Sequence, residues 1–172
     1  MTVKTIITEP NQLLRKVSEP VKSVGKDEQK LMDDMLETMY SANGIGLAAI
    51  QIGIPKRIIV MDLSKEGEKK EPRFFVNPVI KKKDSSKSTY EEGCLSVPNQ
   101  FAEIDRPSRC EVNYLDYNGS EQLLKAEGLL ATCIQHEMDH LEGILFIDYL
   151  SKLKKSMIIK KLSKLKSTRI VV

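Results

Sequence analysis

The chain has 172 residues, enough for one domain with a hydrophobic core that needs no disulfides. Its composition, 41% apolar and 30% charged, is that of a globular protein, and no apolar run approaches the roughly 18 residues of a membrane helix. A net charge of +3 is too small to indicate nucleic-acid binding by itself. We therefore expect a single domain, residues 1–172, that does not bind membranes.

The N-terminal residues have neither the order of a secretory signal nor the Arg-rich pattern of a transit peptide, which predicts a cytoplasmic protein. The cysteines are Cys94, Cys110 and Cys133, an odd number at irregular spacing, which argues against a disulfide framework. At least one thiol is therefore free for chemistry. Cys110 fits the commoner role of a buried structural cysteine.

The first predicted helix covers residues 27–42, where apolar residues recur at helical spacing. It leads into the glycine pair Gly44 and Gly46. The following segments are short and rich in β-branched residues. They predict strands at residues 57–62, 73–80, 101–104, 111–116 and 122–126. An Asn-Gly turn at 118–119 is typical of an antiparallel hairpin. The lysine-rich stretch at 81–87 is predicted to be a solvated loop.

Two further helices are predicted in the last third of the chain. The first, residues 128–141, is apolar on several sides, so it should be buried in the middle of the fold and end at Gly143. The second, residues 151–167, can be capped by Ser151. Its apolar stripe is Leu153, Met157, Ile158, Leu162 and Leu165, and its lysines are Lys154, Lys155, Lys160, Lys161, Lys164 and Lys166. The pattern predicts an α+β fold with mainly antiparallel β-sheets around a central buried helix and an additional C-terminal helix.

Both histidines of the chain lie on the predicted central helix, in His136-Glu137-Met138-Asp139-His140. Residues four positions apart project from one face of an α-helix, so the two imidazoles can bind one metal ion. Glu137 borders that face, where a carboxylate can move protons between bound water and a leaving group. Cys94 is the best third ligand, because a thiolate and two imidazoles leave a fourth position for water. The simpler alternatives are histidines on the helix surface and a buried structural cysteine.

Three segments together resemble the signature of the peptide deformylases, in the order of that family. They are residues 44–51 (GIGLAAIQ), 92–96 (EGCLS) and 135–143 (QHEMDHLEG), and the likeness extends to about residue 150. The resemblance implies a hydrolase that removes the formyl group from the N-terminal formylmethionine of newly made proteins and releases formate. It also implies one divalent metal ion held by Cys94, His136 and His140, commonly Fe²⁺, for which Zn²⁺, Ni²⁺ or Co²⁺ can substitute.

The mechanism that the resemblance implies begins with attack of a metal-bound hydroxide on the formyl carbon, with Glu137 as general acid and base. The Gln51 side-chain amide and the Leu95 backbone N–H would stabilise the oxygen that becomes negative. The alternative for Gln51 is a buried amide that pairs only with backbone. Glu92 is expected to support the site, with Arg106 as its ion-pair partner.

Substrate contacts are expected from two groups of residues. Gly44, Ile45 and Gly46 leave the backbone accessible, so an extended peptide can pair there through main-chain hydrogen bonds. Methionine needs an apolar pocket, and the resemblance places Tyr90, Leu129 and Cys133 around it. Each of these three could equally be a core residue. Phe101 departs from the family, in which many bacterial members have a basic residue near the peptide-binding edge, and this puts a charge contact there in doubt.

Two other functions fit parts of the pattern. A small zinc peptidase also uses His-Glu-x-x-His, but its third ligand usually lies downstream, and here no later histidine exists and Asp148 is the only nearby carboxylate after Gly143. A metal-stabilised module with a basic tail that binds RNA would close its metal site with four protein ligands, whereas three are found. The deformylase interpretation explains both features better.

The expected partners are N-formylmethionyl nascent peptides, and the protein is expected to be a monomer. Two hypotheses stay open for the basic C-terminal helix. It either packs on the domain with its lysines in solvent, which is the commoner behaviour of charge runs, or docks on the ribosome as in some bacterial relatives.

Overall fold

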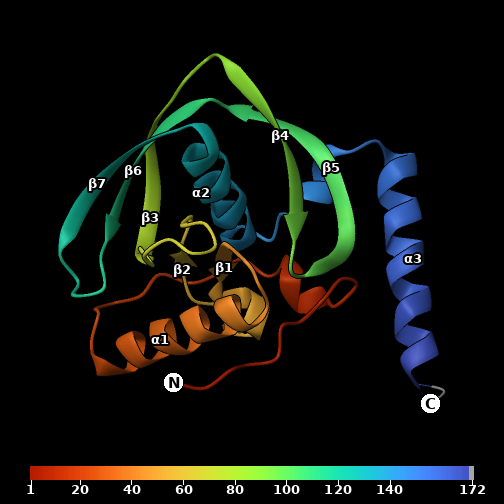
Figure 1. The fold of residues 1–172 in the computed structure, drawn as a ribbon, viewed down its shortest axis with the longest axis horizontal. Coiled ribbons are helices and arrows are strands. Elements are labelled where there is room, and N and C mark those ends of the chain that lie inside the picture. Colours follow the sequence, from red (N-terminus) through yellow and green to blue (C-terminus); the bar gives the residue numbers. More distant parts are fainter. Residues whose placement is uncertain (171–172) are drawn as a thin grey trace.

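The structure, a computed structural model, describes the backbone of residues 1–170 and the side chains of residues 1–165, so the side chain of Lys166 lies outside the described part. Within these residues, two antiparallel sheets are combined with helices (Figure 1). The α-helices are α1 (Lys26–Ser41), α2 (Gly128–Leu141) and α3 (Lys152–Ile170), and the 3-10 helices are η1 (Gln12–Arg15), η2 (Ala49–Ile52) and η3 (Phe146–Tyr149). The predicted α+β class is confirmed.

The larger sheet has the strand order β1-β2-β3-β6-β7, and every neighbouring pair is antiparallel. Its strands are β1 (Gly46–Ala48), β2 (Ile58–Met61), β3 (Arg73–Lys83), β6 (Arg109–Leu115) and β7 (Glu121–Glu127). Side chains of β2 alternate between two helices: Ile58 and Val60 pack with methionines of α1, and Ile59 and Met61 pack with residues of α2. This part of the sheet is therefore buried on both faces, with β1 at its edge.

The smaller sheet consists of β4 (Lys87–Cys94) and β5 (Val97–Pro107). The chain passes from β3 into β4 and from β5 into β6, so the two sheets meet in an arch over α2 (Figure 1). The prediction of a loop at 81–87 is wrong, because β3 extends to Lys83, β4 begins at Lys87 and only residues 84–86 form the turn. The end of β3 and the first residue of β4 are exposed, so the sequence shows no alternation of apolar residues there. Backbone pairing with neighbouring strands holds these ends in place.

Helix α2 has the predicted bounds and lies buried beneath the arch. Gly143 follows it with a φ of +73°, in the left-handed region that favours glycine. A Cβ at this position would lie 2.3 Å from the carbonyl oxygen of Arg15, so the backbone of η1 closes against the end of the helix. This close approach fixes the position of the C-terminal turn of α2, which carries His140.

Helix α3 stands beside β5, apart from the rest of the molecule (Figure 1). The Oγ of Ser151 accepts a hydrogen bond from the Lys154 N–H at 3.2 Å, which confirms the predicted cap. Of the predicted apolar stripe, only Ile158 and Leu162 are buried. The other members, Leu153, Met157 and Leu165, are more than half exposed. A single helix packed along one narrow line against β5 and η3 cannot cover a broader stripe.

Asp148 connects the N-terminal region to the start of α3. Its carboxylate lies 2.5 Å from Nη1 of Arg15 and 2.7 Å from Nζ of Lys155. Burial alone would raise the pKa of Asp148, but the hydrogen bonds from Arg15 and Lys155 outweigh it and hold the pKa below its usual value of 3.8. A carboxylate of this kind stabilises the fold above its unfolded pKa and loses that effect as the pH falls through the folded pKa.

Asp148→Asn should therefore lower the free energy of unfolding by about 1–2 kcal/mol at neutral pH. The difference in the free energy of unfolding between the two proteins should shrink as the pH falls below 3.8, the usual pKa that the Asp148 carboxylate has in the unfolded chain, and towards the lower pKa of the folded state. Urea unfolding followed by circular dichroism across that range measures both values. A difference that stays constant down to the acid end would contradict this account.

Candidate metal centre and active site

Cys94, His136 and His140 come together at the junction of the two sheets with α2. Their potential ligand atoms all lie within 4.8 Å of one another, and Cys94 Sγ is 3.3 Å from His140 Nε2. Cys94 is the last residue of β4, and the two histidines are one helical turn apart on α2. Among the described residues, no other group of three or more His, Cys, Asp or Glu side chains could hold a metal ion. The structure thus brings together the three ligands proposed from the sequence.

The donor set fits a divalent transition metal, because a thiolate with two imidazoles fills three tetrahedral positions and leaves one open. Burial lowers the pKa of His140, which keeps this imidazole neutral as a ligand must be. Nδ1 of His136 lies 2.8 Å from Oε1 of Glu92, which leaves Nε2 available for a metal. Oε2 of Glu137 is buried without a hydrogen-bond partner, so a polar group can be placed between it and the ligands.

Glu92 and Arg106 form the predicted ion pair, which is confirmed by two hydrogen bonds of 2.7 and 2.9 Å. Two residues that were not predicted from the sequence extend this pair. Arg106 Nη1 donates to Asp139 at 2.8 Å, and the Tyr149 hydroxyl donates to the same carboxylate at 2.7 Å. The guanidinium also lies over the Tyr149 ring, 5.0 Å from its centroid. A continuous chain of contacts therefore leads from Tyr149 through Arg106 and Glu92 to His136.

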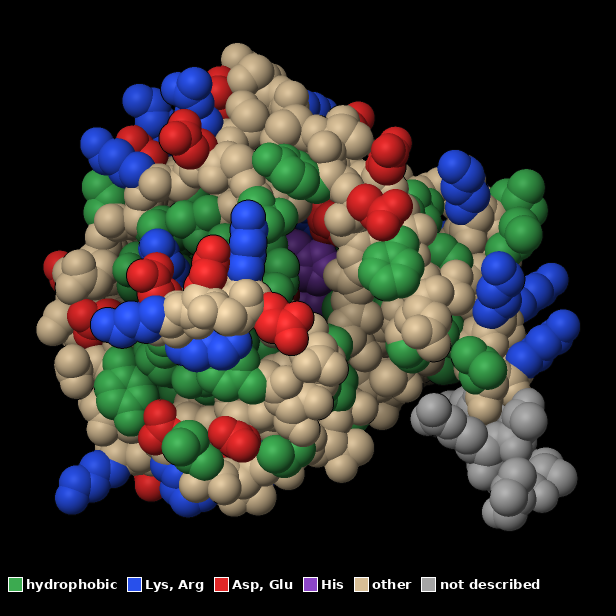
Figure 2. Space-filling view, in the orientation of Figure 1, with side chains coloured by type: hydrophobic (Ala, Val, Ile, Leu, Met, Phe, Trp, Pro, Cys, Tyr) green, Lys and Arg blue, Asp and Glu red, His purple; other side chains and the backbone are tan. Residues whose placement is uncertain are grey.

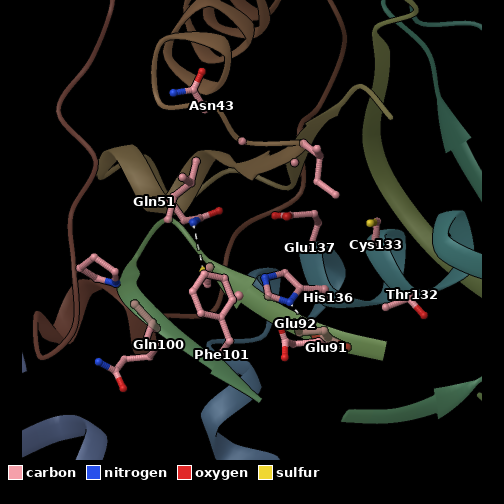
Figure 3. Close-up of a pocket in the computed structure, with 18 of the residues that line it drawn as sticks. Asn43, Gln51, Glu91, Glu92, Gln100, Phe101, Thr132, Cys133, His136 and Glu137 are labelled. Atoms are coloured by element: carbon pink, nitrogen blue, oxygen red, sulfur yellow. Dashed lines mark hydrogen bonds and ion pairs between the residues drawn. The ribbon is translucent and has the colours of Figure 1, made fainter. Parts of the chain in front are cut away.

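Gln51 points its amide at the metal ligands from η2 (Figure 3). Its Oε1 accepts the Ala48 N–H at 2.9 Å, which directs Nε2 toward Ser96 Oγ at 3.0 Å and Cys94 Sγ at 3.6 Å. Leu95 is in the turn directly after Cys94, and we find no acceptor for its N–H among the described residues. Two donors therefore lie beside the proposed metal ligand Cys94.

A cavity of about 460 Å³ opens onto these groups. The sequence-predicted residues that line it are Gly44, Ile45, Gly46, Gln51, Glu92, Cys94, Leu95, Leu129, Cys133, His136 and Glu137. Tyr90 and His140 do not line it: the Tyr90 hydroxyl lies near Gly128, and His140 is buried behind Cys94. Residues that also line it and were not predicted include Glu91, Asn99, Gln100 and Thr132. Thr132 precedes His136 by one helical turn, a spacing that could have identified it.

Two features of the cavity wall explain its residue types. A Cβ on Gly46 would lie 2.5 Å from Oε1 of Glu137, so a side chain there would displace the carboxylate. Burial raises the pKa of Cys133 to about 12, so its thiol is neutral and contributes an apolar surface beside Leu129. Burial likewise raises the pKa of Glu137 to about 7, which suits proton transfer in both directions near neutral pH.

The ligand position that a peptidase would need downstream of the histidines is not available. Asp148, the carboxylate that follows Gly143, binds Arg15 and Lys155, and it does not belong to the group of potential metal ligands found among the described residues. No described helix combines the length and apolar composition of a membrane span.

The chain matches the family model described as polypeptide deformylase over residues 3–156. A peptide deformylase of Pelagibacter ubique (strain HTCC1062) is 76% identical over 172 residues, which is 100% of both chains. The crystal structure of peptide deformylase from Ehrlichia chaffeensis superposes with a TM-score of 0.94 at 44% identity and covers 98% of this chain and 99% of that one. The same enzyme in complex with actinonin is similar at a TM-score of 0.91 and 47% identity, over 95% and 98% of the two chains. The chain therefore belongs to the polypeptide deformylases, metal-dependent hydrolases that remove the formyl group from N-formylmethionyl peptides.

Proposed function

We propose that the formyl group of N-formylmethionyl peptides is hydrolysed in the cavity around Cys94, His136 and His140. The observation that carries this proposal is one arrangement: three metal-ligating atoms within 4.8 Å of one another, beside a buried Glu137 oxygen that has no partner. A structural metal site has no use for an open position and a carboxylate without a partner. Hydrolysis requires both.

Cys94, His136 and His140 would hold the metal through Sγ and the imidazole nitrogens. When bound, a divalent ion lowers the pKa of a coordinated water and polarises the carbonyl oxygen of the substrate. We propose Fe²⁺ in the cell, with Zn²⁺, Ni²⁺ or Co²⁺ able to replace it, since this mixed donor set suits all four ions. Glu92 accepts the Nδ1–H of His136 and so holds the imidazole in the tautomer that binds through Nε2.

Glu137 would move the protons of the reaction. Its carboxylate takes a proton from the attacking water and then gives it to the amide nitrogen of methionine, which leaves as an amine when the C–N bond breaks. The second oxygen of the formate product comes from that water. The contact of Glu137 with Gly46 keeps the Glu137 carboxylate close to the cavity wall formed by β1.

The peptide would enter between β1 and the β4–β5 sheet. The edge strand β1 has one free side, where the backbone of an extended peptide can pair as an added strand. The methionine side chain would occupy the apolar part of the cavity near Leu129 and Cys133. Tyr90 stays a predicted contributor behind this wall. We also propose that the enzyme acts as a monomer on nascent chains in the cytoplasm, and docking of α3 on the ribosome stays a prediction.

Gln51 and the Leu95 N–H would stabilise the oxygen that becomes negative as water attacks. Gln51→Glu keeps the acceptor for the Ala48 N–H and replaces the Nε2 donor by a carboxylate oxygen, which cannot donate to the developing negative oxygen and repels it. We expect kcat/KM for formyl-Met-Ala-Ser to fall about 10²–10³-fold with little change in metal content. Steady-state kinetics together with metal analysis checks this. Unchanged kinetics would mean that the Gln51 amide only bridges Ala48 and Ser96.

The function itself is tested with protein purified without oxygen and loaded with iron or nickel. Formate release from formyl-Met-Ala-Ser is expected, and it should stop when the metal is removed by a chelator and return when nickel is added. Cleavage of unblocked peptides at internal bonds without formate release would favour a zinc peptidase instead. Hydrolysis of neither substrate would overturn the enzymatic proposal.

A further inference from the structure

One wall of the cavity is a short segment that connects α1 to β1. It consists of Asn43, Gly44, Ile45 and Gly46, all of which line the cavity, and we call it the 43–46 segment. Asn43 stands at the end of α1 (Figure 3), and Gly46 is the first residue of the edge strand β1. Because the proposed peptide pairs with this backbone, the position of the segment decides how well the peptide binds.

The 43–46 segment packs closely on two residues of the active site. A Cβ on Gly44 would lie 2.6 Å from Cδ1 of Leu95, and a Cβ on Gly46 would lie 2.5 Å from Oε1 of Glu137. Glycine allows such contacts, but it also loses more conformational freedom on folding than any other residue. A segment with two glycines therefore has to be held in place by contacts from outside it.

Asp62, the residue that follows β2, makes such contacts at both ends of the 43–46 segment. Its N–H donates a hydrogen bond to the carbonyl oxygen of Ile45 at 2.9 Å. Its Oδ2 accepts a hydrogen bond from the hydroxyl of Tyr40, which lies in the last turn of α1. One residue thus holds the strand side of the segment through its backbone and the helix side through its side chain.

The same carboxylate also organises the connection between β2 and β3. Oδ1 accepts the Ser64 N–H at 2.8 Å, and Oδ2 accepts the Glu71 N–H at 3.1 Å. Nζ of Lys70 lies over the Tyr40 ring, 4.9 Å from its centroid. Figure 2 shows this connection crossing the front of the molecule beside the hollow in which a histidine is visible. The connection is therefore held against α1 by the two side chains that also hold the 43–46 segment.

The carboxylate of Asp62 is charged although only 3% of the residue is exposed. Burial alone would raise the pKa of Asp62, but the hydrogen bonds from Tyr40, Ser64 and Glu71 outweigh it and hold the pKa below its usual value of 3.8. A hydrogen bond to an ionised acceptor is roughly twice as strong as one between neutral groups. The contact between Tyr40 and Asp62 is therefore suited to fixing α1 and β2 relative to each other.

We propose that Asp62 is a positioning residue for the substrate, and that its hydrogen bond with Tyr40 fixes the 43–46 segment where it pairs with the peptide backbone. The proposal rests on the function proposed above, because the peptide has to bind along the edge strand β1. Hydrogen bonds between the segment and the peptide are present both before and during the reaction. Weakening them should therefore raise KM and leave kcat nearly unchanged.

Tyr40→Phe tests this proposal, because it removes only the hydroxyl and keeps the ring beneath Lys70. With nickel-loaded enzyme and formyl-Met-Ala-Ser, we expect KM to rise about 3–10-fold, while kcat stays within about twofold and the metal content is unchanged. Asp62→Asn replaces one of the two acceptor oxygens by an amide group and should raise KM further. The double variant should show no larger rise than Asp62→Asn alone, because both changes act on one hydrogen bond.

Tyr117→Phe is a matched control. The Tyr117 hydroxyl donates to Asp33 of the same helix α1 at 3.1 Å, and neither residue lines the cavity. This variant also loses a hydrogen bond between a tyrosine and an aspartate, so its thermal stability should fall, but its KM should not change. An unchanged KM in Tyr40→Phe, or an equal rise of KM in both tyrosine variants, would overturn the proposal.

Hydrogen exchange of the nickel-loaded proteins, followed by mass spectrometry, tests the positioning without any substrate. The amides of residues 43–48 should exchange about 3–10-fold faster in Tyr40→Phe than in the unmodified protein, and at an unchanged rate in Tyr117→Phe. Equal rates in the unmodified protein and Tyr40→Phe would overturn the proposal. If the unmodified enzyme releases no formate from formyl-Met-Ala-Ser, the proposed function fails separately, and the exchange rates alone decide about Asp62.

Discussion

Replacing Glu137 by glutamine should lower kcat/KM for formyl-Met-Ala-Ser by about 10²–10⁴-fold, while the protein stays folded and keeps its metal. Glutamine has the same shape but cannot accept the proton of the attacking water. The position tolerates this change sterically, since the Glu137 carboxylate already fits against Gly46 and its Oε2 has no partner to lose. Burial also raises the pKa of Glu137, so removing the charge should stabilise the fold slightly or leave it unchanged.

The measurements are initial rates of formate release, metal content and thermal unfolding of both proteins. Glu142→Gln is a suitable control, because Glu142 follows α2 directly and its side chain is half exposed and bound to Arg57. The control should keep nearly full activity. If Glu137→Gln kept its rate with the metal in place, another group would have to transfer the proton, and the role proposed for Glu137 would be wrong.

The sequence predicted the metal ligands well because their geometry is mostly local. His136 and His140 are brought together by the helix itself, whatever packs around it. Cys94 could be chosen only by its chemistry and by resemblance, since its approach depends on how β4 ends beside α2. The central helix was predicted to the residue because glycines lie at its start and just beyond its end.

Other features depend on partners that no local pattern contains. Strand β4 was missed because its residues alternate too weakly and its pairing with β5 is what stabilises it. The stripe of α3 was predicted from its own periodicity, but the number of residues it buries depends on how little of β5 and η3 faces it. Asp139 and Tyr149 were missed for the same reason: their contact brings Arg106 of β5 together with residues of α2 and η3 that lie 33 or more positions further along the chain.

The importance of that contact leads to the largest stability effect that we expect. Arg106 is 4% exposed and lies between two carboxylates, Glu92 and Asp139, of which Glu92 also binds His136. Arg106→Met would leave the buried Glu92 carboxylate without its cation, and the half-buried Asp139 with only the Tyr149 hydroxyl. Breaking a buried ion pair from one side costs about 3–5 kcal/mol, so the free energy of unfolding of the metal-free protein should fall by that amount.

The metal site should respond as well, because Glu92 without Arg106 is less well held against Nδ1 of His136. We expect nickel affinity, measured by competition with a chelator, to fall about 10–100-fold. Arg106→Lys keeps the charge but cannot make the two parallel hydrogen bonds to Glu92, so both of its losses should be intermediate. Tyr149→Phe keeps the ring beneath the guanidinium and removes one hydrogen bond to Asp139, which should cost about 0.5–1.5 kcal/mol. If all three variants bound nickel as tightly as the unmodified protein, the network would support the fold without orienting His136.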